Sequence, residues 1–199
     1  MRRLISLLAL AACDPHPPNR PLAPAGPWPV PQAWKSETIP FPLGFAPKLA
    51  HRGTEELRFA PGFFDPAAPG YWSYAFVWRT EDAAALDAAA LGAELTEYFR
   101  GLIDAVDKDG KIGDRDAIAV KVAAAGASFA IEAHVFDPFK TSLPLDLTGT
   151  AERRACPGGG ALWVFVLAPV TTGVRAELEA LARQAACGQP EPPEPAKKP

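Results

Sequence analysis

Residues 71–79 read Tyr-Trp-Ser-Tyr-Ala-Phe-Val-Trp-Arg, and this stretch decides the class of fold. Every second position carries a ring: Trp72, Tyr74, Phe76 and Trp78. A period of two residues is typical of a β-strand, whose successive side chains point to opposite faces. The other face is also largely apolar, so we predict an interior strand that is covered on both sides. On one of these sides, the proline-rich segment that precedes the strand could be the cover. Core packing is the favoured role of the rings, and a platform for a sugar or a peptide is the alternative.

The sequence around this stretch alternates between periods of two and about 3.6 residues. Further strands are predicted at residues 57–60, 117–123, 128–136, 143–148 and 161–168. The last of these is apolar on both faces and is expected to be central. Helices are predicted at 82–106 and 174–186, and Gly92 could divide the first. This order indicates a two-layer α+β fold, with a mainly antiparallel sheet of about five to six strands and both helices packed on one face.

The strands at 117–123 and 128–136 are predicted to pair as a hairpin. Their apolar residues must share a face, because a slip of one residue would place the two sets on opposite faces. Pairing Val122 with Phe129 meets this condition. It leaves a loop at residues 124–127, in which Gly126 can take a positive φ.

The composition indicates one folded domain without a strongly charged surface. The chain has 199 residues, of which 48% are hydrophobic and 22% charged, enough to bury one core. Its net charge of −3 provides no basic field, so we expect no nucleic-acid partner. The sequence motifs of serine hydrolases, zinc peptidases and phosphate-binding loops are absent, and we expect no cofactor.

The first residues of the chain combine a basic start, an apolar run and a small-residue site that ends in cysteine. Arg2 and Arg3 precede the apolar residues 4–10, and Leu-Ala-Ala-Cys follows at 10–13. This stretch resembles the signal peptide and lipobox of bacterial lipoproteins. The resemblance implies that residues 1–12 are removed and that Cys13 carries lipid, which would anchor the protein to a membrane of the cell envelope, facing the periplasm or the exterior. An ordinary cleaved signal with an incidental cysteine is the alternative.

The remaining chain divides into a tether, a domain and a tail. Residues 13–48 are rich in proline, which fixes φ and removes a hydrogen-bond donor, so we expect an extended, lipid-anchored tether. A proline-rich recognition peptide is the alternative. Three rings within this segment are expected to dock onto the domain rather than face solvent: Trp28, Trp34 and Phe41. The domain itself is predicted at 49–187, and residues 188–199 read as a disordered Pro/Glu tail.

Two cysteines remain after Cys13, in a compartment that permits disulfides. The strand from residue 161 and the helix back from residue 173 have similar predicted lengths, roughly 26 and 22 Å. The helix end therefore returns near the start of the strand, and we predict a disulfide between Cys156 and Cys187. Two free thiols, or a catalytic or metal-binding Cys156, are the alternatives.

Two polar segments are candidate sites. Residues 107–112 resemble part of an EF-hand loop, but Ala105 occupies the position of the first carboxylate, so a polar turn without metal is favoured over a calcium site. Glu132, His134 and Asp137 form the best acid–base group, since the first two share a strand face. A solvated polar face explains them as well and is the favoured interpretation.

Two functions of different classes remain open. The first is a non-enzymatic binding or structural module, tethered to the membrane by lipid and directed at an envelope protein or polymer. The second is an envelope-associated hydrolase or transferase that uses the face of Glu132, His134 and Asp137.

Overall fold

The computed structural model describes residues 28–82 and 84–188. Outside the described residues lie the predicted signal peptide, the lipobox with Cys13 and the part of the proline-rich segment that precedes Trp28. The tail from residue 189 also lies outside them. None of the helices in the described ranges is long and apolar enough to cross a bilayer.

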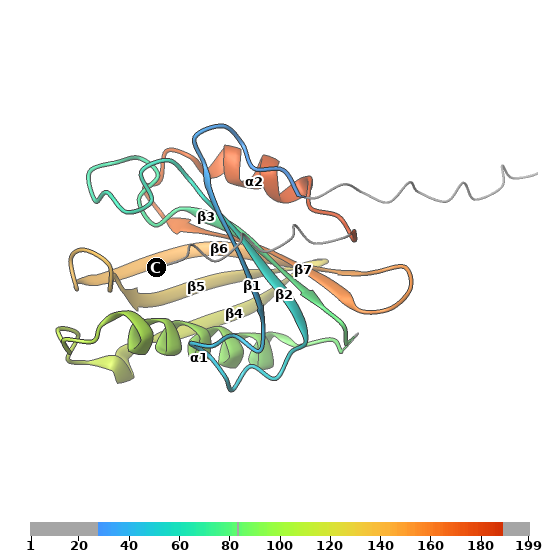
Figure 1. Ribbon diagram of the computed structural model, residues 1–199, viewed down its shortest axis with the longest axis horizontal. Helices are drawn as coiled ribbons and strands as arrows, with labels where there is room; N and C mark the ends of the chain where they lie inside the picture. The colour runs from blue at the N-terminus through green and yellow to red at the C-terminus, as the bar shows by residue number, and fades with distance from the viewer. Residues whose placement is uncertain (1–27, 83, 189–199) are drawn as a thin grey trace, which may run out of the picture.

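One antiparallel sheet organises the fold, with the strand order β1-β2-β3-β7-β6-β5-β4 (Figure 1). Its strands are β1 (Lys35–Phe41), β2 (Gly53–Phe59), β3 (Tyr74–Thr80), β4 (Ala119–Ala125), β5 (Ser128–Phe136), β6 (Pro144–Ala155) and β7 (Ala161–Pro169). The helices are α1 (Ala88–Val106) and α2 (Arg175–Arg183), and a short 3₁₀ turn spans Arg115–Ala117. The predicted α+β class and antiparallel sheet are confirmed, and β7 is central as expected. The strand count is seven rather than five to six, because β1 lies in the predicted tether.

The two helices lie on opposite faces of the sheet, so the prediction that both pack on one face was wrong. On β7, Trp163 and Phe165 pack toward α1, whereas Val164 and Val166 pack toward α2. A strand that is apolar on both faces needs cover on both. Each helix supplies one cover, α1 mainly over β4 and β5 and α2 over β3 and β7.

The aromatic residues of the 71–79 stretch belong to the core on the α1 face. Trp72, Tyr74, Phe76 and Trp78 are at most 3% exposed, which excludes an open binding platform. Trp72 precedes β3 instead of lying in it, because its φ of 48° breaks the extended chain. Helix α1 begins after Asp87, whose side chain accepts a hydrogen bond from the Ala90 amide, and it continues through Gly92 without a break.

The folded domain begins well before the predicted boundary at residue 48. Strand β1 pairs along its whole length with β2, and Trp28, Leu43 and Leu49 are at most 2% exposed. Proline at position 40 is compatible with this pairing because β1 is an edge strand and needs donors on one side only. The expected docking of Trp28 and Phe41 on the domain is confirmed, and Trp34 is partly buried against the α2 side.

The β4–β5 hairpin has the predicted faces but a different register. Val122 pairs with Ile131 and Ala124 pairs with Phe129, so the predicted partner of Val122 is wrong by two residues. The strands continue to Ala125 and Ser128 and leave a two-residue turn, in which Gly126 has a φ of 65°. A two-residue turn of this kind matches the twist of the paired strands, and it adds ladder pairs that a longer loop would lose.

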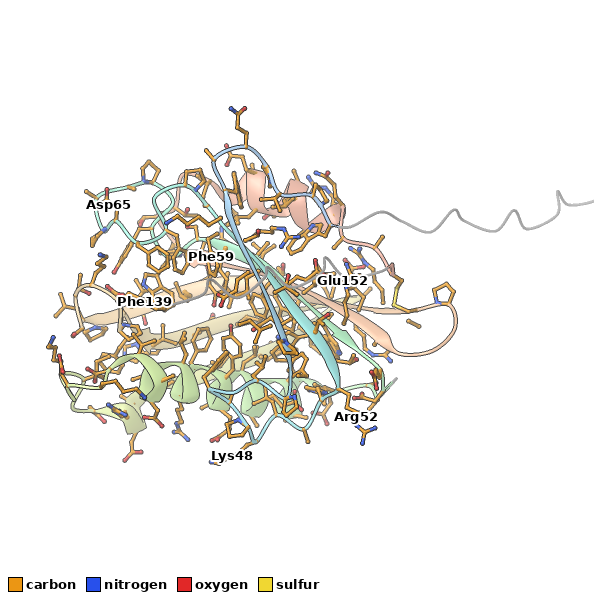
Figure 2. The ribbon with its side chains drawn as sticks, viewed as in Figure 1. Lys48, Arg52, Phe59, Asp65, Phe139 and Glu152 are labelled. Atoms are coloured by element: carbon orange, nitrogen blue, oxygen red, sulfur yellow. A yellow bond between two sulfur atoms is a disulfide. The ribbon has the colours of Figure 1, made fainter. Side chains whose placement is uncertain are left out.

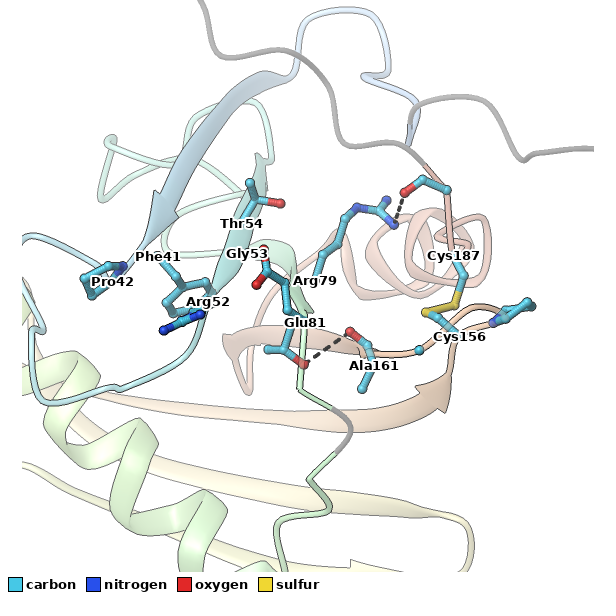
Figure 3. Close-up of a pocket in the computed structure, with 14 residues that line it drawn as sticks. Phe41, Pro42, Arg52, Gly53, Thr54, Arg79, Glu81, Cys156, Ala161 and Cys187 are labelled. Carbon is cyan, nitrogen blue, oxygen red and sulfur yellow. Dashed lines mark hydrogen bonds between the residues drawn. A yellow bond between two sulfur atoms is a disulfide. The ribbon is translucent and has the colours of Figure 1, made fainter.

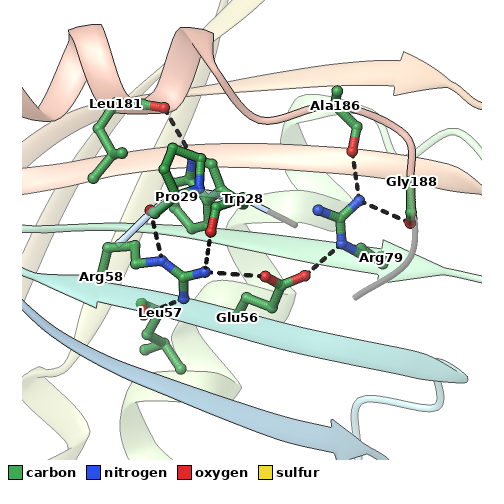
Figure 4. Close-up of polar contacts among 9 residues, drawn as sticks. All are labelled: Trp28, Pro29, Glu56, Leu57, Arg58, Arg79, Leu181, Ala186 and Gly188. Carbon is green, nitrogen blue, oxygen red and sulfur yellow. Dashed lines mark hydrogen bonds and ion pairs between the residues drawn. The ribbon is translucent and has the colours of Figure 1, made fainter. Parts of the chain in front are cut away.

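A buried polar network ties the start and the end of the described chain to the α2 face (Figure 4). Arg58 is fully buried and donates to the carbonyl oxygens of Trp28 and Pro29 at 2.7 and 3.1 Å. Its guanidinium lies 4.6 Å from the Trp28 ring centroid, and it pairs with Glu56 at 3.3 Å. Arg79 donates to the other oxygen of Glu56 and to the carbonyl of Ala186. One buried carboxylate therefore links two arginines, which hold the first and the last described segments, at Trp28–Pro29 and at Ala186.

The predicted disulfide is confirmed: Cys156 and Cys187 are bonded, with Cα atoms 5.5 Å apart. The bond closes a loop over a sequence separation of 31 and thereby reduces the conformational entropy of the unfolded chain. We expect the Cys156→Ser/Cys187→Ser double variant to lose about 3–4 kcal/mol of unfolding free energy. Denaturant unfolding of wild type and variant without reductant tests this. Equal midpoints would show that the bond contributes nothing.

Candidate functional site

An aromatic cavity lies between α1, the strands β1–β3 and three loops on the α1 face. Its volume is about 260 Å³. Eight rings line it: Phe45, Phe59, Phe63, Phe64, Trp72, Tyr74, Tyr98 and Phe139. Ile39, Leu57 and Leu102 complete the apolar lining, and Glu37 adds a carboxyl group. Phe59 and Phe139 lie at the same end of the sheet, where the loop that carries Asp65 folds over (Figure 2).

The lining is brought together from segments far apart in the sequence. Strand alternation directs Leu57 and Phe59 of β2 to the α1 face, next to Tyr74 of β3. Phe45 reaches the cavity because Gly101 lets the 42–49 segment approach helix α1. A Cβ at position 101 would lie 2.1 Å from the Phe45 carbonyl oxygen. The glycine is therefore needed for close packing at this point.

A buried carboxyl group lies beside the cavity. Glu55 is 0% exposed, and its Oε1 accepts a hydrogen bond from Trp78 Nε1 at 3.0 Å. Its Oε2 has no hydrogen bond of normal geometry, although the Tyr98 hydroxyl lies close enough to act on the carboxyl group. Burial raises the pKa of Glu55 from 4.5 to about 8, against the lowering effect of hydrogen bonds from Trp78 and Tyr98. The group is therefore mostly protonated at neutral pH.

The electrostatic environment of Glu55 connects it to the cavity lining. Burial raises the pKa values of Tyr74 and Tyr98 well above their ordinary range, and the nearby charge of Glu55 raises them further. Partial desolvation raises the pKa of Glu37, whose charge in turn acts on Glu55. Three residues that line the cavity are thus close enough to sense ionisation of Glu55. The site combines aromatic surface, phenolic hydroxyl groups and two carboxyl groups.

The residues singled out from the sequence lie elsewhere. Glu132 and His134 are on the face of β5 away from α1, where Glu132 stands opposite Lys121. His134 Nδ1 lies 2.7 Å from Asp146 Oδ1, and both side chains are substantially exposed. This arrangement matches the favoured expectation of a polar, solvated sheet face.

Asp137 does not belong to that solvated face, because its side chain is buried. It is 1% exposed and accepts hydrogen bonds from the Tyr71 hydroxyl at 2.6 Å and the Thr141 amide at 2.8 Å. Burial acts to raise its pKa, but these hydrogen bonds outweigh it and lower the pKa. Asp137 therefore stabilises the turn before β6.

A histidine that the sequence reasoning missed lies between two carboxylates. His51 Nε2 lies 2.8 Å from Glu94 of α1, and Nδ1 lies 3.5 Å from Asp82. The hydrogen bond to Glu94 is the main cause that raises the pKa of His51, which also contacts the Trp78 ring at 5.7 Å between centroids. The cluster joins the segment before β2 to α1. No local pattern around His51 marks it in the sequence.

A second hollow, of about 1030 Å³, lies beside the disulfide (Figure 3). It is wide and mixes Arg52, Glu81 and backbone groups with Cys156 and Cys187. Arg79 also lines it but is held by Glu56 and the Ala186 carbonyl. This hollow marks where residues 187–188 meet the sheet, and among the described residues only one aromatic ring, that of Phe41, lines it.

The EF-hand-like segment forms a turn. The Asp107 carboxylate accepts hydrogen bonds from the amides of Lys111 and Ile112, each at 2.9 Å, and pairs with Arg115. Its oxygens are thereby used within the turn. In residues 28–82 and 84–188, no group of three or more His, Cys, Asp or Glu side chains could hold a metal ion. Comparisons of the chain with protein-family models, curated proteins and solved structures find no match in any of the three.

Proposed function

We propose that this domain is a non-enzymatic binding module that holds one small, mainly apolar molecule in the aromatic cavity. The observation that carries the proposal is the convergence of eight rings around about 260 Å³ of space. With the lipobox resemblance, the proposal places the module at a bacterial envelope, anchored through Cys13. Its ligand or partner would then be a component of that envelope.

The size and lining of the cavity support a small ligand. An apolar cavity of about 150 Å³ is large enough to bind benzene. A volume of about 260 Å³ therefore suits one ring or a short branched chain with a few substituents. Ligand sites are typically apolar with a small number of polar groups, and Glu37, Tyr74 and Tyr98 provide such groups here.

A substitution that fills the cavity tests the proposal. Toluene should bind the wild-type protein, with calorimetric heat and chemical-shift changes confined to residues that line the cavity. Leu102→Trp replaces an aliphatic lining side chain by a bulkier ring and should weaken toluene binding at least tenfold.

Leu143→Trp is the matched control, because Leu143 is 62% exposed and the same bulk should not affect binding there. Thermal unfolding of both variants verifies that they are folded. Absence of toluene binding to wild type, or equal binding to wild type and Leu102→Trp, would refute the cavity as the site.

A further inference from the structure

We propose that the ligand of this cavity carries an alkylated ammonium group, which the rings and the carboxyl groups of Glu37 and Glu55 recognise together. This inference rests on the proposed binding function and names the chemical class of its ligand. It follows from three features of the site: the sign of the charged groups, the aromatic lining and the incomplete hydrogen bonding of Glu55.

The one charged side chain among the described residues that line the cavity, Glu37, is acidic. Glu37 lines the cavity and Glu55 pairs with the lining residue Ile39 of β1, whereas no lysine or arginine is among the residues that line it. An anionic ligand would be repelled by ionised carboxylates and would find no basic partner among these residues. A cation would be attracted by both carboxylates.

The aromatic lining is also suited to a cation. A cation near the face of a ring is attracted by the ring quadrupole, and aromatic cages that hold quaternary ammonium groups use this effect. One ring of the lining already has a cationic neighbour, since Lys35 Nζ lies 5.4 Å from the Phe64 ring centroid. Lys35 is exposed and lies at the edge of the cavity.

Glu55 Oε2 makes no hydrogen bond of normal geometry, so the site holds a buried carboxyl group whose hydrogen bonding is incomplete. Without a ligand, burial keeps the carboxyl group protonated, with a pKa of about 8. A bound cation would favour the carboxylate, so the Glu55 O–H bond breaks and its proton passes to solvent.

Other titratable groups face Glu55 from the elements packed on it. They are Glu37 of β1, Tyr74 of β3 and Tyr98 of α1, and His51 contacts the Trp78 ring that donates to Glu55. Glu37 adds negative charge, and the two tyrosines stay neutral up to high pH because their pKa values are raised. Proton release from Glu55 should therefore strengthen cation binding as the pH rises toward 8.

A pair of nearly isosteric probes tests the charge requirement. Choline and 3,3-dimethylbutan-1-ol differ chiefly in the replacement of the quaternary nitrogen by carbon. We expect choline to bind wild type at least tenfold more tightly than the alcohol at pH 8, as measured by calorimetry. Titrations in buffers with different ionisation enthalpies should show proton uptake by the buffer when choline binds at pH 7.

Each outcome separates this inference from the proposed function. Equal affinities of choline and the alcohol, or binding of toluene without choline, would overturn the cation inference and leave the binding function intact. Absence of binding by all three probes would overturn both.

Glu55→Gln isolates the carboxyl group. The variant should bind choline at least tenfold more weakly at pH 8 and lose the pH dependence, while toluene binding stays within twofold. Glu179→Gln removes the same charge from an exposed position on α2, on the other face of the sheet, and should leave choline affinity unchanged. Choline affinity that is identical in Glu55→Gln and wild type would exclude Glu55 from recognition.

Discussion

Unfolding free energy should fall by on the order of 5 kcal/mol between about pH 4.5 and pH 8, and Glu55→Gln should remove most of that loss. The folded-state pKa of this carboxyl group is raised to about 8 by burial, from 4.5. In this window the folded protein binds a proton that the unfolded chain has released. The stabilisation by protonated Glu55 is therefore complete below pH 4.5 and is lost as the pH rises toward 8. Above pH 8 the unfolding free energy changes little through this group.

Denaturant unfolding of wild type and Glu55→Gln at pH 5, 7 and 9 measures this difference. The amide oxygen of Gln can still accept from Trp78 Nε1, so the substitution keeps the hydrogen bond and removes the titration. The His51 pKa is also raised, and its loss of charge weakens both proteins alike as the pH rises through that value. Parallel curves for the two proteins would show that Glu55 does not titrate in this range.

Arg58→Ala should destabilise the protein by about 3–5 kcal/mol, because it leaves buried polar groups without their partner. The substitution removes donors to the carbonyls of Trp28, Pro29 and Leu57 and one of the cations beside the fully buried Glu56. It also removes the cation–π contact with Trp28. Hydrogen exchange should show the largest loss of protection in residues 28–34, which this network holds on the sheet.

Lys48→Ala is the control for this effect. Lys48 forms an ion pair with Glu97 at 2.7 Å, but its side chain is 78% exposed, so the expected cost is less than about 1 kcal/mol. Similar losses for Arg58→Ala and Lys48→Ala would mean that the buried network does not hold the N-terminal segment.

The proposed ligand site and the buried network lie on opposite faces of the same strand. On β2, Glu55 points toward α1 and the cavity, whereas Glu56 and Arg58 point toward α2 and the chain ends. Three charged residues of a seven-residue strand are therefore fully buried. Residues of these types are rarely buried without partners, and the strand predicted at 57–60 leaves out both glutamates. Their burial depends on β1 and Trp28, which lie in the predicted tether.

Local periodicity was sufficient to predict the elements that pack by a simple repeat. Within the strand predicted at 71–79, the alternation is confirmed from residue 74 onward. The doubly apolar strand at 161–168 and the stripe of α1 are also confirmed, because a side-chain period depends on the nearest neighbours in the chain. The Cys156–Cys187 bond was also predictable, because the lengths of one strand and one helix bring their ends together.

Long-range packing decided the other features. Three features depend on which surfaces are left uncovered once the sheet forms. They are the placement of the helices on opposite faces, the pairing of β1 and the two-residue turn of the β4–β5 hairpin. The cavity and the raised pKa of Glu55 depend on segments from residue 37 to residue 139 that meet only in space. A pattern within a few residues cannot specify such burial, because the dielectric environment of a side chain is set by its neighbours in three dimensions.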